Sequence, residues 1–144
     1  MRHRFLIAVA ALAASACASV PMASKERDDA AKTFRPHAEL TNLYVYRASE
    51  WGSGVKYPVI VDGRMVGELP GSTFLVTAVP PGKHRLVVTA ETTKSLDFET
   101  LVGKNFYIKV TPAMGWFSAN ANLYAMEEPE AQEDIRGCKM IEGY

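Results

Sequence analysis

The chain has 144 residues with 16 basic and 16 acidic side chains, so its formal net charge is zero. Apolar residues make up 48% of the sequence and charged residues 22%, as in an ordinary single globular domain. A balanced charge produces no long-range field that would attract a nucleic acid or an anionic membrane surface. We therefore expect no nucleic acid among the partners.

The first sixteen residues have the three parts of an export signal. Residues 1–4 (MRHR) are basic, residues 5–14 (FLIAVAALAA) are apolar, and residues 14–16 (ASA) are small. An apolar helix of this length reaches about 15 Å, which is too short to cross a hydrocarbon layer of about 30 Å. Residues 1–16 are therefore predicted to be a signal peptide that is removed from the mature protein.

Cys17 directly follows these small residues, an arrangement that resembles the lipobox of bacterial lipoproteins. The resemblance implies that the sulfur of Cys17 takes a diacylglycerol and the new amino terminus takes an acyl chain, which together hold a protein on a membrane. Ala14 stands where lipoboxes usually carry Leu, and the same letters fit an ordinary cleavage site after residue 16 or residue 18. Ala18 stands where an inner-membrane retention signal would place Asp. We therefore expect the periplasmic face of the outer membrane, with a soluble periplasmic protein as the alternative.

The second cysteine, Cys138, depends on the fate of the first. If Cys17 carries lipid, no disulfide within the chain can form, and Cys138 is expected to be a small buried apolar side chain. If Cys17 is free, a bridge between Cys17 and Cys138 becomes possible.

Residues 17–40 are polar and contain Pro21 and Pro36, a composition typical of a flexible tether. Ser24, however, is a good helix N-cap, and Ala30 and Phe34 would share one face of a helix that Pro36 ends. We expect a lipid-anchored tether with a short helix that docks on the domain.

Residues 41–127 alternate apolar and polar side chains with a period of two, and turn signals recur every eight to twelve residues. The strongest of these signals is Asp62-Gly63, which favours a type I′ hairpin turn. We predict a mainly β protein, a single antiparallel β-sandwich of seven or eight strands. Residues 128–144 are predicted to be a short C-terminal helix, with Pro129 in its first turn and Gly137 after its end, followed by a tail.

Signatures of catalysis and of cofactor or metal binding are absent from the sequence, so we expect no cofactor and no enzymatic activity. His84 could act as a general base if the fold brought a serine and a carboxylate to it, but a lone histidine at the start of a strand is usually solvated. The acidic residues between 127 and 134 lack the spacing of a calcium loop and fit a solvated helix face.

Three aromatic residues form the candidate binding surface. Trp51 lies in a glycine-rich segment between two predicted strands, and Trp116 and Phe117 lie in another. Loops on a rigid sandwich often carry binding residues, and tryptophan is over-represented at binding hot spots. The competing interpretation, which we favour for Trp116 and Phe117, is that the two side chains plug the open end of the sandwich. For Trp51 the two interpretations are equal.

Several blocks spread over nearly the whole mature chain resemble bacterial lipoproteins that are grouped as a domain of unknown function: VPMAS (20–24), AAKTF (30–34), YVYR (44–47), PVIVDGRMVGEL (58–69), PPGKH (80–84), NFY (105–107), MGWF (114–117) and CKM (138–140). Residues 59–84 are also similar to PEGA-type surface modules, which are small β-sandwiches. The resemblance implies an exported, lipid-anchored sandwich with no assigned activity, and it supports Cys17 as the attachment point.

We therefore expect a β-sandwich that binds the membrane through lipid on Cys17 and that has a binding or structural role toward an unknown envelope protein or ligand. The alternative is a periplasmic carrier that holds a small apolar ligand or a lipid between its sheets.

Overall fold

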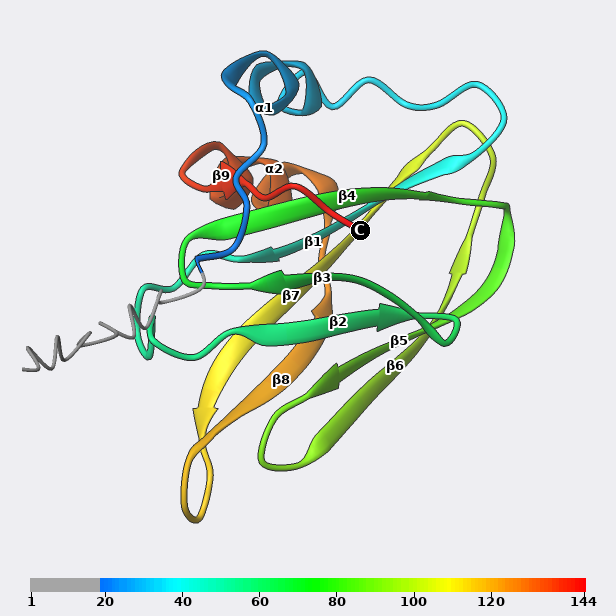
Figure 1. Ribbon diagram of the computed structural model, residues 1–144. Coiled ribbons are helices and arrows are strands. Elements are labelled where there is room, and N and C mark those ends of the chain that lie inside the picture. The colour runs from blue at the N-terminus through cyan, green and yellow to red at the C-terminus, as the bar shows by residue number, and fades with distance from the viewer. Residues whose placement is uncertain (1–18) are drawn as a thin grey trace, which may run out of the picture.

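The computed structural model describes residues 19–144 as two β-sheets that pack face to face, with two short helices on the outer side of the larger sheet (Figure 1). The elements in chain order are α1 (Lys25–Ala31), β1 (Thr41–Arg47), β2 (Tyr57–Val61), β3 (Arg64–Leu69), β4 (Thr73–Val79), β5 (Gly82–Thr89), β6 (Thr93–Thr100), β7 (Asn105–Met114), β8 (Ala119–Ala125), α2 (Glu128–Arg136) and β9 (Lys139–Met140).

The predicted mainly β class is confirmed, but the prediction of seven or eight strands in a purely antiparallel sandwich is wrong. The larger sheet has the order β8-β7-β1-β4-β9 and the smaller sheet β3-β2-β5-β6. In the larger sheet β1 is parallel to β7, and β4 is parallel to the two-residue β9. The chain passes through the whole smaller sheet between β1 and β7, so no local turn sets their direction. A strand of two residues is too short to show a period-two pattern.

The space between the two sheets is filled by one cluster of buried apolar side chains, to which both sheets contribute. Gly67 on β3 shows how closely the layers approach, because a Cβ atom built there would lie 2.9 Å from Leu75 and 3.1 Å from Ile141. These side chains occupy the region in which the alternative function, an apolar-ligand carrier, would need its cavity.

A second, more aromatic cluster lies on the outer face of the larger sheet beneath the helices. Two tyrosines of this cluster form hydrogen bonds through their hydroxyl groups to the helices that cover them. The Tyr44 hydroxyl donates to the carbonyl of Ala31 at 2.9 Å, and the Tyr46 hydroxyl donates to the carboxylate of Asp134 at 3.1 Å. Strand β1 is therefore buried on both faces, which ties the helices to the centre of the fold.

The two predicted helices are present, but α1 ends at Ala31, so the expectation that Phe34 shares a helix face with Ala30 is wrong. Ser24 caps α1 by accepting a hydrogen bond from the backbone N–H of Arg27, and α2 has Pro129 at its start and Gly137 as its C-cap. Among residues 19–144, neither helix is long and apolar enough to span a membrane.

Candidate functional site

The first described residues run beside the C-terminal segment rather than as a free tether. Val20 is buried, the carbonyl of Pro21 accepts a hydrogen bond from the N–H of Glu142 at 2.8 Å, and Met22 pairs with Ile141. We call residues 19–32 the N-terminal strap. Because backbone pairing begins by Pro21, the position at which the chain enters the fold is fixed.

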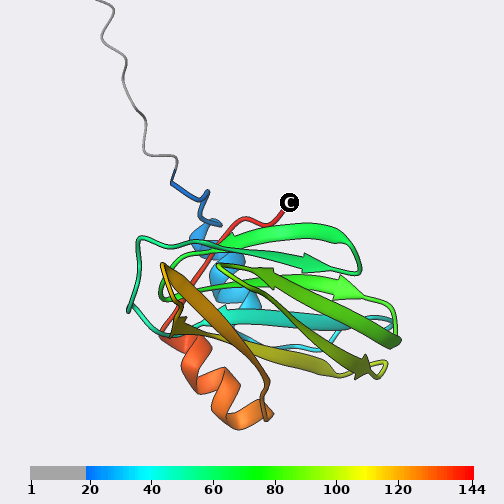
Figure 2. The same ribbon diagram turned by 90° about the horizontal axis from the view of Figure 1, so that it is seen from below.

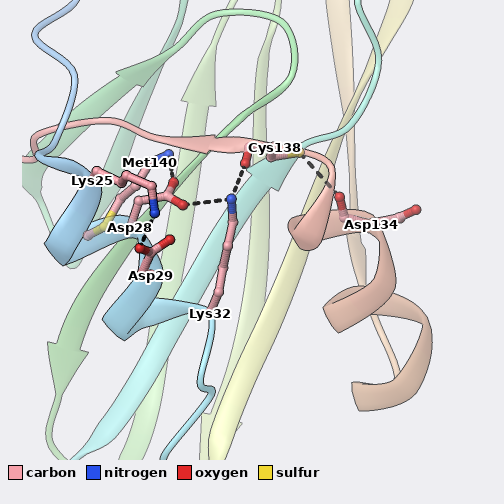
Figure 3. Close-up of polar contacts among 7 residues, drawn as sticks. All are labelled: Lys25, Asp28, Asp29, Lys32, Asp134, Cys138 and Met140. Carbon is pink, nitrogen blue, oxygen red and sulfur yellow. Dashed lines mark hydrogen bonds and ion pairs between the residues drawn. The ribbon is translucent and has the colours of Figure 1, made fainter.

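Helix α1 fastens the strap through a pair of side chains one turn apart (Figure 3). The carboxylate of Asp28 accepts a hydrogen bond from the N–H of Met140 at 2.7 Å and forms an ion pair of 2.7 Å with Lys32. The ammonium of Lys32 also donates to the carbonyl of Cys138 at 2.6 Å. The pair is largely shielded from solvent, so its charges hold the strap to β9 more firmly than an exposed pair would. On the exposed side of the helix, Lys25 pairs with Asp29.

Of the two cysteines, Cys17 lies outside the described residues, whereas Cys138 is buried beneath the strap. Its Sγ lies 3.4 Å from the carbonyl oxygen of Asp134, a contact drawn in Figure 3. Burial raises the pKa of the Cys138 thiol to about 11. Almost none of it is thiolate at neutral pH, and since the thiolate is the reactive form, Cys138 has the properties of a structural residue.

Residues 48–56, which we call the Trp51 loop, are held by one buried arginine. The guanidinium of Arg47 donates to the carbonyls of Val55 at 2.6 Å, Trp51 at 2.7 Å and Gly52 at 2.9 Å, and it lies 4.8 Å from the ring centre of Tyr57. Arg47 is fully buried, and its Nε has no hydrogen-bond partner among the described residues. Burial lowers the pKa of Arg47, although a guanidinium remains charged at any physiological pH. The loop backbone therefore takes its shape from a charge inside the fold.

Residues 114–118 form the hairpin tip between β7 and β8, and one carboxylate holds them. The side-chain oxygens of Glu91 accept hydrogen bonds from the backbone N–H groups of Trp116 and Phe117, both at 2.9 Å, and of Ser118 at 2.8 Å. The N–H groups of Phe117 and Ser118 are the main cause that holds the pKa of Glu91 below its ordinary value. At Gly115 a Cβ atom would collide with this carboxylate and with the carbonyl of Ser118, so the tip requires glycine there.

The prediction that Trp116 and Phe117 plug the end of the sandwich is wrong. Their side chains are 94% and 97% exposed, and that of Met114 is 81% exposed. The backbone is fixed by Glu91 in a position that directs the side chains into solvent. Trp51 is 52% exposed, which places it between the two interpretations that the sequence left open.

The two loops that carry these residues lie on the same side of the molecule. The Trp51 loop, the hairpin between β7 and β8 and the beginning of the N-terminal strap are all at the left in Figure 1 and again in Figure 2, which is turned by 90°. Sequence reasoning named the three aromatic residues but missed Arg47 and Glu91, which hold their loops. Neither of these side chains stands in a motif that would have revealed it.

His84 lies in a shallow groove of the smaller sheet, where it does not meet the requirements of a catalytic base. Its Nδ1 is 2.6 Å from the carboxylate of Asp62 and its Nε2 is 2.6 Å from the carbonyl of Pro80, so both ring nitrogens are occupied. The groove has a volume of about 650 Å³, and the residues that line it include no serine, threonine or cysteine: Asp62, Lys83, His84, Arg85, Asp97, Phe98 and Glu99. The geometry is that of a structural histidine beside the Asp62 turn.

Burial would raise the pKa of Asp62, but the backbone N–H of Arg85 and the ring of His84 hold it below its usual value. The neighbouring ion pair between Arg85 and Asp97, 2.6 Å long, is well exposed to solvent. Among residues 19–144, no group of three or more histidine, cysteine or acidic side chains is placed to hold a metal ion.

Comparison with known proteins finds relatives without an assigned function. An uncharacterized protein of Haemophilus influenzae is 36% identical over 132 residues, which cover 90% of this chain and 79% of that protein. No solved structure matches the chain significantly. Residues 37–123, from just before β1 into β8, match a family described as proteins of unknown function, and this segment contains Arg47, Glu91 and the three aromatic residues. The chain belongs to this family, DUF2846.

Proposed function

We propose that the protein is an exported module, attached through lipid on Cys17 to the periplasmic face of the outer membrane, which has a binding or structural role in the cell envelope and performs no catalysis. The proposal begins from the leader, in which a short apolar segment and three small residues directly precede Cys17. A cysteine at that position is the acceptor that lipid attachment requires.

The observation that carries the proposal furthest is the docking of the strap. The described chain is already packed at Val20, three positions after Cys17, and the clamp of Asp28 and Lys32 fastens it to the C-terminal segment. A long flexible tether would let an attached domain diffuse away from the membrane, whereas this arrangement would hold the sandwich against it in one orientation.

The two cysteines provide a matched pair for the test, because Cys138 is buried and poorly reactive. Cells are grown with labelled palmitate, and the protein is then recovered from membranes for intact-mass analysis. We expect a chain that begins at Cys17 and carries a diacylglycerol and one acyl chain. Cys17→Ser should abolish the label, whereas Cys138→Ala should retain it. A mature protein that begins near residue 17 or 19 with an unmodified mass would contradict the proposal.

A further inference from the structure

The most exposed apolar side chains of the described residues face solvent on the side where the strap begins. We infer that the hairpin tip and the Trp51 loop enter the headgroup region of the bilayer that holds the protein, so that the module makes a second, non-covalent contact with lipid. This contact rests on the lipid attachment proposed above, which would bring these two loops to the membrane surface.

The composition of the tip suits the interface between lipid and water. Residues 113–120 (AMGWFSAN) contain no charged side chain. Tryptophan and other aromatic residues are enriched at the level of the headgroups, because their apolar rings are partly withdrawn from water while polar groups remain hydrated. The tip therefore brings no charged side chain of its own into the headgroup region, and the carboxylate beside it, that of Glu91, is already bonded to backbone N–H groups of the tip.

Glu91 holds the backbone of this tip in the conformation that would contact lipid. Its carboxylate accepts hydrogen bonds from three successive N–H groups of the tip, so these three donors need no water when the tip enters the interface. The same bonds prevent Trp116 and Phe117 from folding back onto the sandwich. A rigid tip loses less conformational freedom on binding than a mobile loop would.

The position of the strap decides which side of the module meets the bilayer. A single residue, Ala18, separates Cys17 from the first described residue, and two residue steps span about 7 Å at most. Lipid on Cys17 would therefore hold the beginning of the strap next to the membrane surface. Since the strap is fixed to the sandwich by backbone pairing and by the Asp28–Lys32 clamp, the side that carries it must face the lipid.

The hairpin tip and the Trp51 loop lie on that side in both views of the molecule. The turn between β6 and β7 also exposes apolar side chains, with Leu101 60% and Val102 57% exposed, but it lies on the opposite side in both views. This turn provides a control surface of similar character that the proposed orientation directs away from the membrane.

The test uses the two tryptophans of the chain as depth probes. The native protein is purified from membranes and reconstituted into vesicles of phosphatidylethanolamine and phosphatidylglycerol, with and without bromine on the acyl chains. In a Trp51→Phe variant, the emission of Trp116 should fall about twofold in brominated vesicles because its ring lies at the interface. In a Trp116→Phe variant, the emission of Trp51 should fall less because half of its surface packs against the protein.

A second measurement separates the contact from the attachment. The mature chain from residue 17, with Cys17→Ser, is titrated with the same vesicles. Replacing Trp116 and Phe117 together by serine should lower its partition coefficient about tenfold or more, whereas replacing Leu101 and Val102 together by serine should leave it unchanged. Circular dichroism of each variant establishes that the fold is intact.

The outcomes distinguish the two proposals. A native protein that carries lipid and stays with the vesicles, but whose Trp116 is not quenched, would overturn the inference and would indicate that the tip faces a protein partner. If no lipid is found on Cys17, the proposed attachment fails, and the titration alone decides the inference. In that case a tip-dependent partition would support it, and no partition at any lipid concentration would overturn it.

Discussion

The Trp51 loop and the hairpin tip carry exposed aromatic side chains on the same side of the molecule, and one charged side chain holds each of them. In the first, a guanidinium donates to three backbone carbonyls of the loop, besides that of Leu69; in the second, a carboxylate accepts from three backbone N–H groups. The two arrangements differ in burial. Arg47 is fully buried and contacts Tyr57 of the core, whereas Glu91 is only partly buried and lies in the turn between β5 and β6.

Burial determines what each bond contributes to the whole fold. When the buried guanidinium is removed, the part-buried carbonyls of Trp51, Gly52 and Val55 lose their donor and the space that Arg47 filled is left empty, so the free energy of unfolding falls. N–H groups at an exposed tip can turn to water when Glu91 is removed. The Trp51 loop is therefore coupled to global stability, whereas the hairpin tip can change shape while the rest of the protein stays folded.

Replacement of Arg47 should have the largest effect. In an Arg47→Leu variant the carbonyls of Trp51, Gly52 and Val55 lose their donor, and we expect the free energy of unfolding to fall by about 2–4 kcal/mol. Urea denaturation followed by circular dichroism measures this change. Arg64→Leu, at an exposed arginine at the start of β3, is the control and should change stability by no more than about 0.5 kcal/mol. Equal midpoints for the two variants would show that Arg47 does not support the loop.

Replacement of Glu91 should act locally. Gln has nearly the same shape as Glu, but it keeps a single acceptor oxygen and cannot replace both carboxylate oxygens, of which one binds Trp116 and the other binds Phe117 and Ser118. In a Glu91→Gln variant we expect faster hydrogen exchange at the tip amides that face the amide nitrogen, with a smaller shift of the unfolding midpoint than in Arg47→Leu. Glu99→Gln on β6 is a matched control at an exposed carboxylate. Unchanged exchange at the tip in Glu91→Gln would contradict the role assigned to this side chain.

The parts of the fold that could be predicted are those that depend on neighbouring residues. The turn at Asp62-Gly63 has the expected positive φ angles, 49° and 81°, because both residues tolerate this backbone conformation. Helix α1 begins after Ser24 for an equally local reason, the hydrogen bond from the N–H of Arg27. Period-two alternation located strands but carried no information on the direction of their partners, so the parallel pairs β1–β7 and β4–β9 were missed.

The candidate site depends on contacts between distant segments, so the sequence indicated its residues but not their arrangement. Glu91 lies between β5 and β6, 25 residues before Trp116, and nothing near it in the sequence marks it as the support of another turn. Arg47 is the last residue of an apolar strand, a position at which the side chain of an arginine is ordinarily exposed to solvent. The exposure of Trp116 and Phe117 follows from Glu91. For this reason the usual expectation, that large aromatic side chains are buried, failed here.

The smallest effect we expect is the response of the hairpin tip to acid. The pKa of Glu91 in the folded protein is lowered from its ordinary value of 4.5, so the carboxylate binds protons less readily when folded than when unfolded. The stabilisation that it provides is fully present above pH 4.5 and is lost as the pH falls through the lowered pKa of the folded state. In a Trp51→Phe background, the emission of Trp116 should therefore change in this acid range and stay constant above it.

Asp62 and Asp97 also have lowered pKa values, so the comparison must be made with the same background carrying Glu91→Gln, in which this transition should be missing. An identical acid transition in both proteins would mean that another carboxylate controls the tip, and the contrast with the buried Arg47 would no longer rest on Glu91.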